Sequence, residues 1–147
     1  MKRYPRETSE SKIFDAIFGG LGRLFFRKKV TPGRVAAGVD RNYVREEWQK
    51  IQDSIQTGGE SRFQQAVIAA DKLLDYALKA TVPGETMGDR LINARQAFSD
   101  PAAYQAAWDA HKLRNRLVHE TNYQAISWEA RPAIQNFERA LRNLGVL

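Results

Sequence analysis

The chain has 147 residues and a formal net charge of +6, and its 43% hydrophobic and 27% charged content is ordinary for a soluble globular protein. This length suits one domain with a real core rather than two. The sequence contains no cysteine, which excludes disulfides and thiolate metal sites and fits a reducing, cytoplasmic compartment. With only two histidines in addition, we expect neither a metal site nor a cofactor.

The positive charge is concentrated near the N-terminus. Residues 1–39 carry the whole excess of +6, whereas acidic and basic residues balance over 40–147. We therefore predict a basic arm with a linker over 1–39 and a helical domain over 40–147. A basic arm is attracted to phosphate backbones and anionic headgroups, and a solubilising tail is the alternative.

An amphipathic segment lies within this arm, at residues 12–29. Its apolar side chains fall on one side of a helix drawn at about 100° per residue, and Arg27-Lys28-Lys29 follows them. The segment is too short and too charged to span a bilayer. It favours a helix lying in an anionic membrane interface, which would make the protein peripheral to a membrane. The alternatives are a helix that covers a groove on the domain and a helix buried by a partner.

The domain begins with two predicted helices. Asp40 is a good N-cap, and apolar residues at helical spacing follow it as far as Gly58-Gly59, which ends the first helix. The second helix is expected over 60–81, and Asp71 lies at the border of its apolar arc. The buried arc comprises Phe63, Val67, Ala70, Leu74, Ala77 and Leu78.

Three further helices are predicted after the Pro83-Gly84 turn. Thr86 and Asp89 form an acidic variant of the capping box at the start of a short helix that continues to Phe98. Asp100-Pro101 begins a fourth helix, which runs to about residue 121. A fifth helix ends near residue 145, with Pro132 in its first turns. Because no segment alternates with period two, we predict an all-α fold, an antiparallel bundle of four to five helices.

A charged residue interrupts the apolar arc of the fourth helix. Arg114 lies in the middle of this arc, and a guanidinium inside a bundle must be paired because an isolated buried charge is costly. Asp71 of the second helix is the natural partner, so we predict an Arg114–Asp71 contact, with Asp75 as the second choice. The arc itself comprises Ala106, Ala107, Ala110, Leu113, Leu117 and Val118.

A second stripe borders that arc and contains both histidines: Tyr104, Trp108, His111, Asn115 and His119. Such a row suits a homodimer interface, a groove or a nucleic-acid stacking surface. The alternative is an ordinary boundary stripe of half-buried rings. Metal binding is not expected, because the two histidines lie about 12 Å apart along a helix at about 1.5 Å per residue.

The sequence from Arg114 to His119 resembles the R-x4–6-H motif of HEPN domains. Similarity to small bacterial HEPN-like proteins extends to the neighbouring residues Ala110 to Leu113 and Glu120, and also to residues 69–75 and 84–91. The resemblance covers about 40–147. It implies a HEPN-like helical bundle that dimerises with the two motifs facing each other.

In catalytic HEPN domains this pair of motifs forms a metal-independent endoribonuclease site, often in toxin or defence proteins. The resemblance implies that a ribose 2′-OH attacks the adjacent phosphate and leaves a 2′,3′-cyclic phosphate. His119 would then move the proton, Arg114 would hold the scissile phosphate and Asn115 would orient it, while Arg116 could contact the RNA backbone. The supporting residues are Asp71, Asp75, His111, Arg116 and Glu120.

Two features argue for a different function. On one helix Arg114 and His119 lie about 140° apart, so a single chain cannot easily aim both at one phosphate, although a two-fold dimer would bring both copies together. An Arg114 fully occupied by Asp71 also could not bind substrate. The alternative is a non-catalytic dimerisation or interaction module, associated with a membrane surface through residues 12–29.

Overall fold

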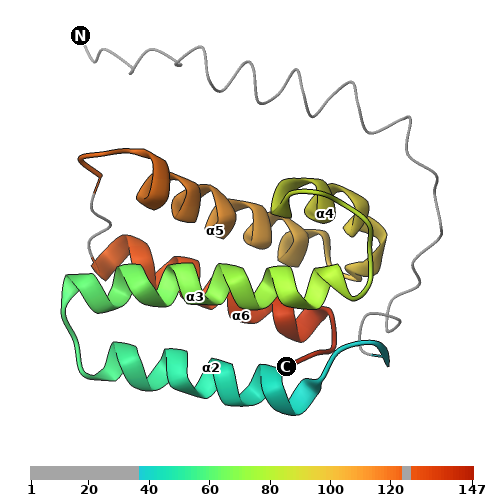
Figure 1. Ribbon diagram of the computed structural model, residues 1–147, viewed down its shortest axis with the longest axis horizontal. Helices are drawn as coiled ribbons and strands as arrows, with labels where there is room; N and C mark the ends of the chain where they lie inside the picture. Colours follow the sequence, from blue (N-terminus) through green and yellow to red (C-terminus); the bar gives the residue numbers. More distant parts are fainter. Residues whose placement is uncertain (1–36, 124–126) are drawn as a thin grey trace, which may run out of the picture.

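The computed structural model describes residues 37–123 and 127–147. The predictions about the basic arm and the amphipathic segment 12–29 lie outside these residues. The described part contains five α-helices, one short 3-10 helix and no strand, which confirms the predicted all-α class. In chain order the elements are α2 (Arg41–Gln56), α3 (Glu60–Lys79), α4 (Met87–Asn93), η3 (Arg95–Ala97), α5 (Pro101–His119) and α6 (Ser127–Asn143) (Figure 1).

The helix α3 holds the fold together. It packs against α2 on one side and against α5 and α6 on the other, while α5 also packs along α6 (Figure 1). All six residues of the predicted apolar arc of α3 are buried, so this prediction is confirmed. None of the helices in the described residues has the length and apolar character needed to cross a bilayer.

Helix starts follow local capping rules. The Asp40 carboxylate accepts hydrogen bonds from the backbone N–H groups of Asn42 at 3.0 Å and Tyr43 at 3.1 Å. Asp100 caps α5 in the same way, through the N–H of Ala102 at 2.8 Å. These groups satisfy donors that a helix cannot pair internally. The predicted N-caps at both positions are confirmed.

The predicted capping box is present at the start of α4. The N–H of Asp89 donates to Thr86 Oγ1 at 3.1 Å, and the N–H of Thr86 donates to Asp89 Oδ2 at 2.9 Å. The helix ends earlier than predicted, at Asn93. The 3-10 helix η3 follows it, and Phe98 has an extended backbone while remaining buried. The chain must turn here to reach the start of α5.

The capping box should make the free energy of unfolding depend on pH in the acidic range. The backbone N–H of Thr86, and then its hydroxyl, hold the pKa of Asp89 below its ordinary value. A lowered carboxyl pKa stabilises the fold above the unfolded-state pKa, and this contribution is lost as pH falls through the folded-state pKa. We therefore expect Asp89→Asn to flatten the fall in unfolding free energy between about pH 5 and pH 2. Denaturant titrations at several pH values measure this change.

The control for this experiment is Asp53→Asn on the exposed face of α2, where Asp53 bonds only the Gln49 amide among the described residues. That variant should retain the acid dependence of the wild type. An Asp89→Asn curve that parallels the wild-type curve would show that the capping box does not contribute to acid sensitivity.

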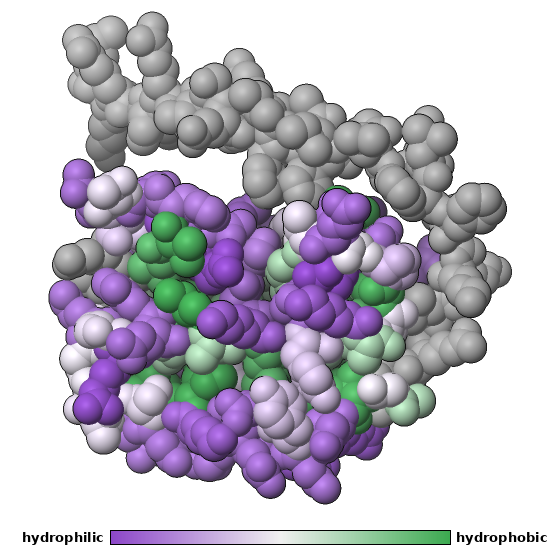
Figure 2. Space-filling view, in the orientation of Figure 1, coloured by the Kyte–Doolittle hydropathy of each residue, from purple (hydrophilic) through white to green (hydrophobic). Residues whose placement is uncertain are grey.

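The apolar arc of α5 differs from the prediction near its end. Leu113 and Leu117 are half-buried, and Val118, expected in the core, is 48% exposed. The reason is that the last turn of α5 lies at one end of the molecule, where none of the other described elements covers this side of the helix. The face shown in Figure 2 is mostly hydrophilic where it is coloured, with hydrophobic patches between the polar side chains.

Candidate functional site

Four polar side chains of α3 and α5 form a closed ring. Asp71 Oδ1 lies 2.7 Å from His111 Nδ1, and His111 Nε2 lies 3.2 Å from Asn115 Nδ2. Arg114 Nη1 then donates to Asn115 Oδ1 at 3.0 Å. The ring closes through an ion pair in which Arg114 Nε lies 3.2 Å from Asp71 Oδ2, without the alignment of a hydrogen bond. We call these residues the polar ring.

The ring confirms the predicted Arg114–Asp71 contact. Asp71 is only 3% exposed, and burial of a carboxylate is tolerated only where cations or donors surround it. Here a guanidinium and an imidazole do so from the same helix. Arg114 is not enclosed, because a quarter of its side chain is exposed.

His111 is the ring member whose position the sequence did not indicate. The sequence pattern predicts a position on the stripe that borders the apolar arc, whereas His111 is 5% exposed and bonded to Asp71. The spacing in the sequence is a signal that could have indicated this position. Arg114 and Asn115 follow His111 by three and four residues, so both lie on the same helix face as His111. A second residue able to contact Asp71 could have been found in this way.

The stripe of α5 therefore divides along its length. Trp108 and His111 are buried, Tyr104 and Asn115 are half-buried, and His119 is exposed. Edge-to-face ring contacts link Tyr104 to Trp108 at 6.4 Å and Trp108 to His111 at 6.1 Å between centroids. Other residues of the same chain cover the buried rings of Trp108 and His111. At the C-terminal end of α5, the stripe residues exposed to solvent are therefore His119 and, in part, Asn115.

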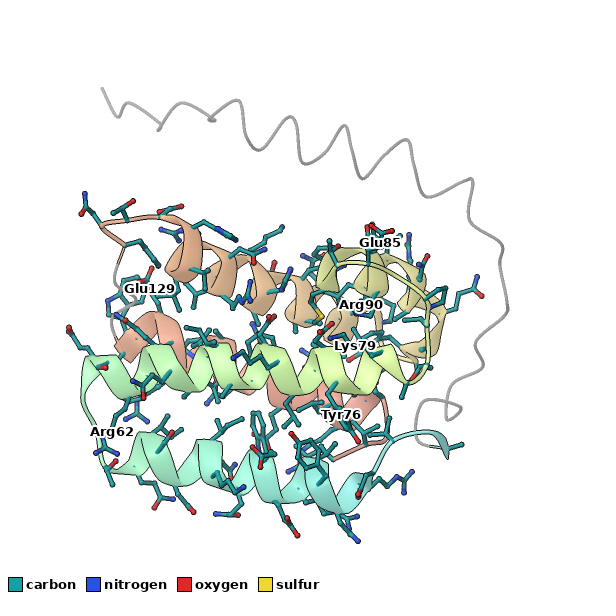
Figure 3. All side chains as sticks on the ribbon, viewed as in Figure 1. Arg62, Tyr76, Lys79, Glu85, Arg90 and Glu129 are labelled. Atoms are coloured by element: carbon teal, nitrogen blue, oxygen red, sulfur yellow. The ribbon has the colours of Figure 1, made fainter. Side chains whose placement is uncertain are left out.

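Asp75 is engaged elsewhere. Its carboxylate lies 2.6 Å from Arg90 Nε and 3.0 Å from Lys79 Nζ, and Arg90 also donates to the Gly84 carbonyl at 2.6 Å. Figure 3 shows Arg90 and Lys79 close together where α4 meets the end of α3. Asp75 thus holds α4 against α3 and does not contact Arg114. Gly84 is required here, because a Cβ on it would lie 2.8 Å from the Arg90 backbone nitrogen.

The last turn of α5 carries Arg116 and His119 at the surface. Arg116 Nε lies 3.7 Å from Glu120 Oε1, and its guanidinium stacks 3.9 Å above the Tyr123 ring. His119 is exposed and makes no hydrogen bond or ion pair within residues 37–123 and 127–147. Its imidazole is therefore accessible to a bound substrate.

Tyr123 does not compete as a base at this end of the molecule. Burial raises the pKa of its hydroxyl, and the Glu129 carboxylate raises it further, while Arg116 lowers it. Glu129 lies at the end of the molecule where α6 begins (Figure 3). A tyrosine with a raised pKa stays protonated at neutral pH, so His119 is the better candidate for proton transfer.

Within the described ranges, no group of three or more His, Asp or Glu side chains is placed to hold a metal ion. Comparison of this chain with family models, with curated proteins and with solved structures finds no match. Support for the candidate site therefore comes from the geometry of its side chains. It combines a guanidinium held by the polar ring with an exposed imidazole five residues further along the same helix.

Proposed function

We propose that the chain is a HEPN-like, metal-independent endoribonuclease of the toxin or defence type. The observation that carries this proposal is the contrast between two motif residues on α5. Arg114 is held by Asp71 and Asn115, whereas His119 is exposed and unengaged among the described residues. A fixed cation and an available acid–base group are the two components that this chemistry needs.

The ion pair with Asp71 does not prevent Arg114 from binding a phosphate. Its contacts use Nε and Nη1, and Nη2 makes no hydrogen bond to any of the described residues. A guanidinium has five donors in a fixed fork, so one edge can face the ring while Nη2 donates to an anion. The partial exposure of the side chain agrees with this division.

In the proposed reaction His119 accepts the proton of a ribose 2′-OH. The 2′-oxygen forms a bond to the adjacent phosphorus, and the bond from phosphorus to the 5′-oxygen breaks. The proton held by His119 then passes to the departing 5′-oxygen, and the other product carries a 2′,3′-cyclic phosphate. Arg114 stabilises the charge that develops on the phosphate oxygens, and the exposed Arg116 contacts the RNA backbone.

A homodimer would complete the site. Because Arg114 and His119 lie about 140° apart on α5, the two motifs work together best when a second copy faces the first. Val118 in the last turn of α5 and Trp128 at the start of α6 are 48% and 68% exposed, and both lie at this end of the molecule. Their apolar surface favours contact with a second copy here.

The experiment uses the full chain, a single-stranded RNA and excess EDTA. We expect cleavage that leaves 2′,3′-cyclic phosphate ends, and resistance of the same RNA when the attacking nucleotide carries a 2′-deoxyribose. Absence of cleavage, or cleavage that EDTA abolishes, would overturn the proposal. If the chain forms dimers without cleaving RNA, the exposed apolar end belongs to a non-catalytic interaction module.

A further inference from the structure

We infer that Asp71 and His111 are positioning residues for Arg114, that Asp71 acts directly and His111 acts through Asn115, and that His111 carries its proton on Nδ1. This inference rests on the proposed function only where it concerns cleavage. The arrangement of protons in the polar ring follows from the side chains themselves.

The direction of each hydrogen bond in the ring is fixed by Arg114. A guanidinium can only donate, so the atom of Asn115 that faces Nη1 must be the amide oxygen. The amide nitrogen then faces His111 Nε2, and because it can only donate, Nε2 must accept. The imidazole proton is therefore on Nδ1, where it is donated to the Asp71 carboxylate at 2.7 Å.

Other arrangements place two donors face to face. Reversing the Asn115 amide would bring its NH₂ group against Arg114 Nη1. A proton on His111 Nε2 would bring two N–H groups together at the 3.2 Å contact with Asn115. Because Asp71 and His111 are almost fully buried, water cannot easily replace a lost partner. The ring contact between Trp108 and His111 also restricts the imidazole plane.

The consequence for Arg114 is a guanidinium held by one ion pair and one hydrogen bond. Asp71 supplies the counter-charge beside Nε, and Asn115 accepts a hydrogen bond from Nη1 only while its amide is oriented by His111. Preorganised donors stabilise developing charge without reorganisation during the reaction. His111 does not touch the substrate in this account, and its effect on cleavage passes through Asn115.

The first test measures the imidazole directly. In the ¹⁵N-labelled full chain, long-range ¹H–¹⁵N correlation should show His111 with a protonated Nδ1 and an unprotonated Nε2. Asn115→Asp replaces the donor that faces Nε2 by an acceptor, and it should place a proton on Nε2. A proton on Nε2 in the wild type, or an unchanged Nε2 in N115D, would overturn the inference.

The second test measures Arg114. Asn115→Leu should leave the proton of His111 on Nδ1, increase the mobility of the Arg114 Nε–H group in ¹⁵N relaxation, and lower kcat for RNA by about 10- to 100-fold with little change in KM. Gln105→Leu, which replaces an exposed amide on the same helix, should change none of these quantities. An Arg114 equally rigid in N115L and the wild type would contradict the positioning role.

The two proposals fail in different ways. Suppose that the wild type shows the expected His111 tautomer and N115L shows a mobile Arg114, but the wild type does not cleave RNA. This result would overturn the proposed ribonuclease function and leave the inference about the polar ring standing. Cleavage of RNA by a protein whose His111 is protonated on Nε2 would overturn the inference about the polar ring and leave the proposed ribonuclease function standing.

Discussion

Replacing Asp71 by alanine should lower the unfolding free energy by about 3–5 kcal/mol, because removal of one partner leaves other polar groups buried without compensation. His111 loses the acceptor of its Nδ1 proton, and Arg114 loses its counter-charge. Such a loss is a large part of the 5–15 kcal/mol or so that stabilises a typical domain. Urea denaturation followed by circular dichroism measures it.

Asp53→Ala is the matched control for this substitution. Asp53 is exposed on α2, and within residues 37–123 and 127–147 its side chain hydrogen-bonds only the Gln49 amide. Its replacement should therefore change the unfolding free energy by no more than about 0.5 kcal/mol. If Asp71→Ala is no more destabilising than this control, the polar ring does not stabilise the packing of α5 against α3.

Replacing His119 by alanine should lower the rate of RNA cleavage by about 10²- to 10⁴-fold, the usual contribution of a general acid or base. The fold should be unaffected, because the side chain is exposed and makes no bond within the described part of the chain. We expect the unfolding free energy to change by no more than about 0.5 kcal/mol. Cleavage rates and denaturation curves of the same preparation separate the two effects.

The control for His119→Ala is Gln105→Ala, which lies about 20 Å away along α5 at about 1.5 Å per residue. Gln105 is exposed, and in the part of the chain that the structure describes its side chain bonds only the Asp109 carboxylate. Its replacement should leave the cleavage rate within about twofold, since no motif residue touches it. Full cleavage by the His119→Ala protein would remove the proposed mechanism.

Much of the fold could be predicted from the sequence because its signals are local. Asp40, Thr86 with Asp89, and Asp100 each satisfy backbone donors within three residues, so their effect does not depend on the rest of the molecule. The Arg114–Asp71 contact could be predicted for a related reason. Arg114 interrupts one apolar arc and Asp71 lies at the border of another, and a buried charge needs an opposite one nearby.

The remaining features depend on how the helices are placed. A helical wheel gives the direction of His111 and Val118 but not what covers them, and α3 covers the first while the second lies exposed at the end of the molecule. The partner of Asp75 depends on the turn through Gly84, which brings Arg90 back onto α3. The sequence predicts the Pro83-Gly84 turn itself, but not that the turn brings Arg90 against Asp75.

The central claim is that Arg114 and His119 serve one site. The most direct measurement compares RNA cleavage in EDTA by Arg114→Gln, by His119→Ala and by the protein that carries both substitutions. Residues that act as a unit are strongly non-additive, so we predict that the double variant is no slower than the slower single variant. Losses that multiply in the double variant, or full cleavage by either single variant, would contradict the claim.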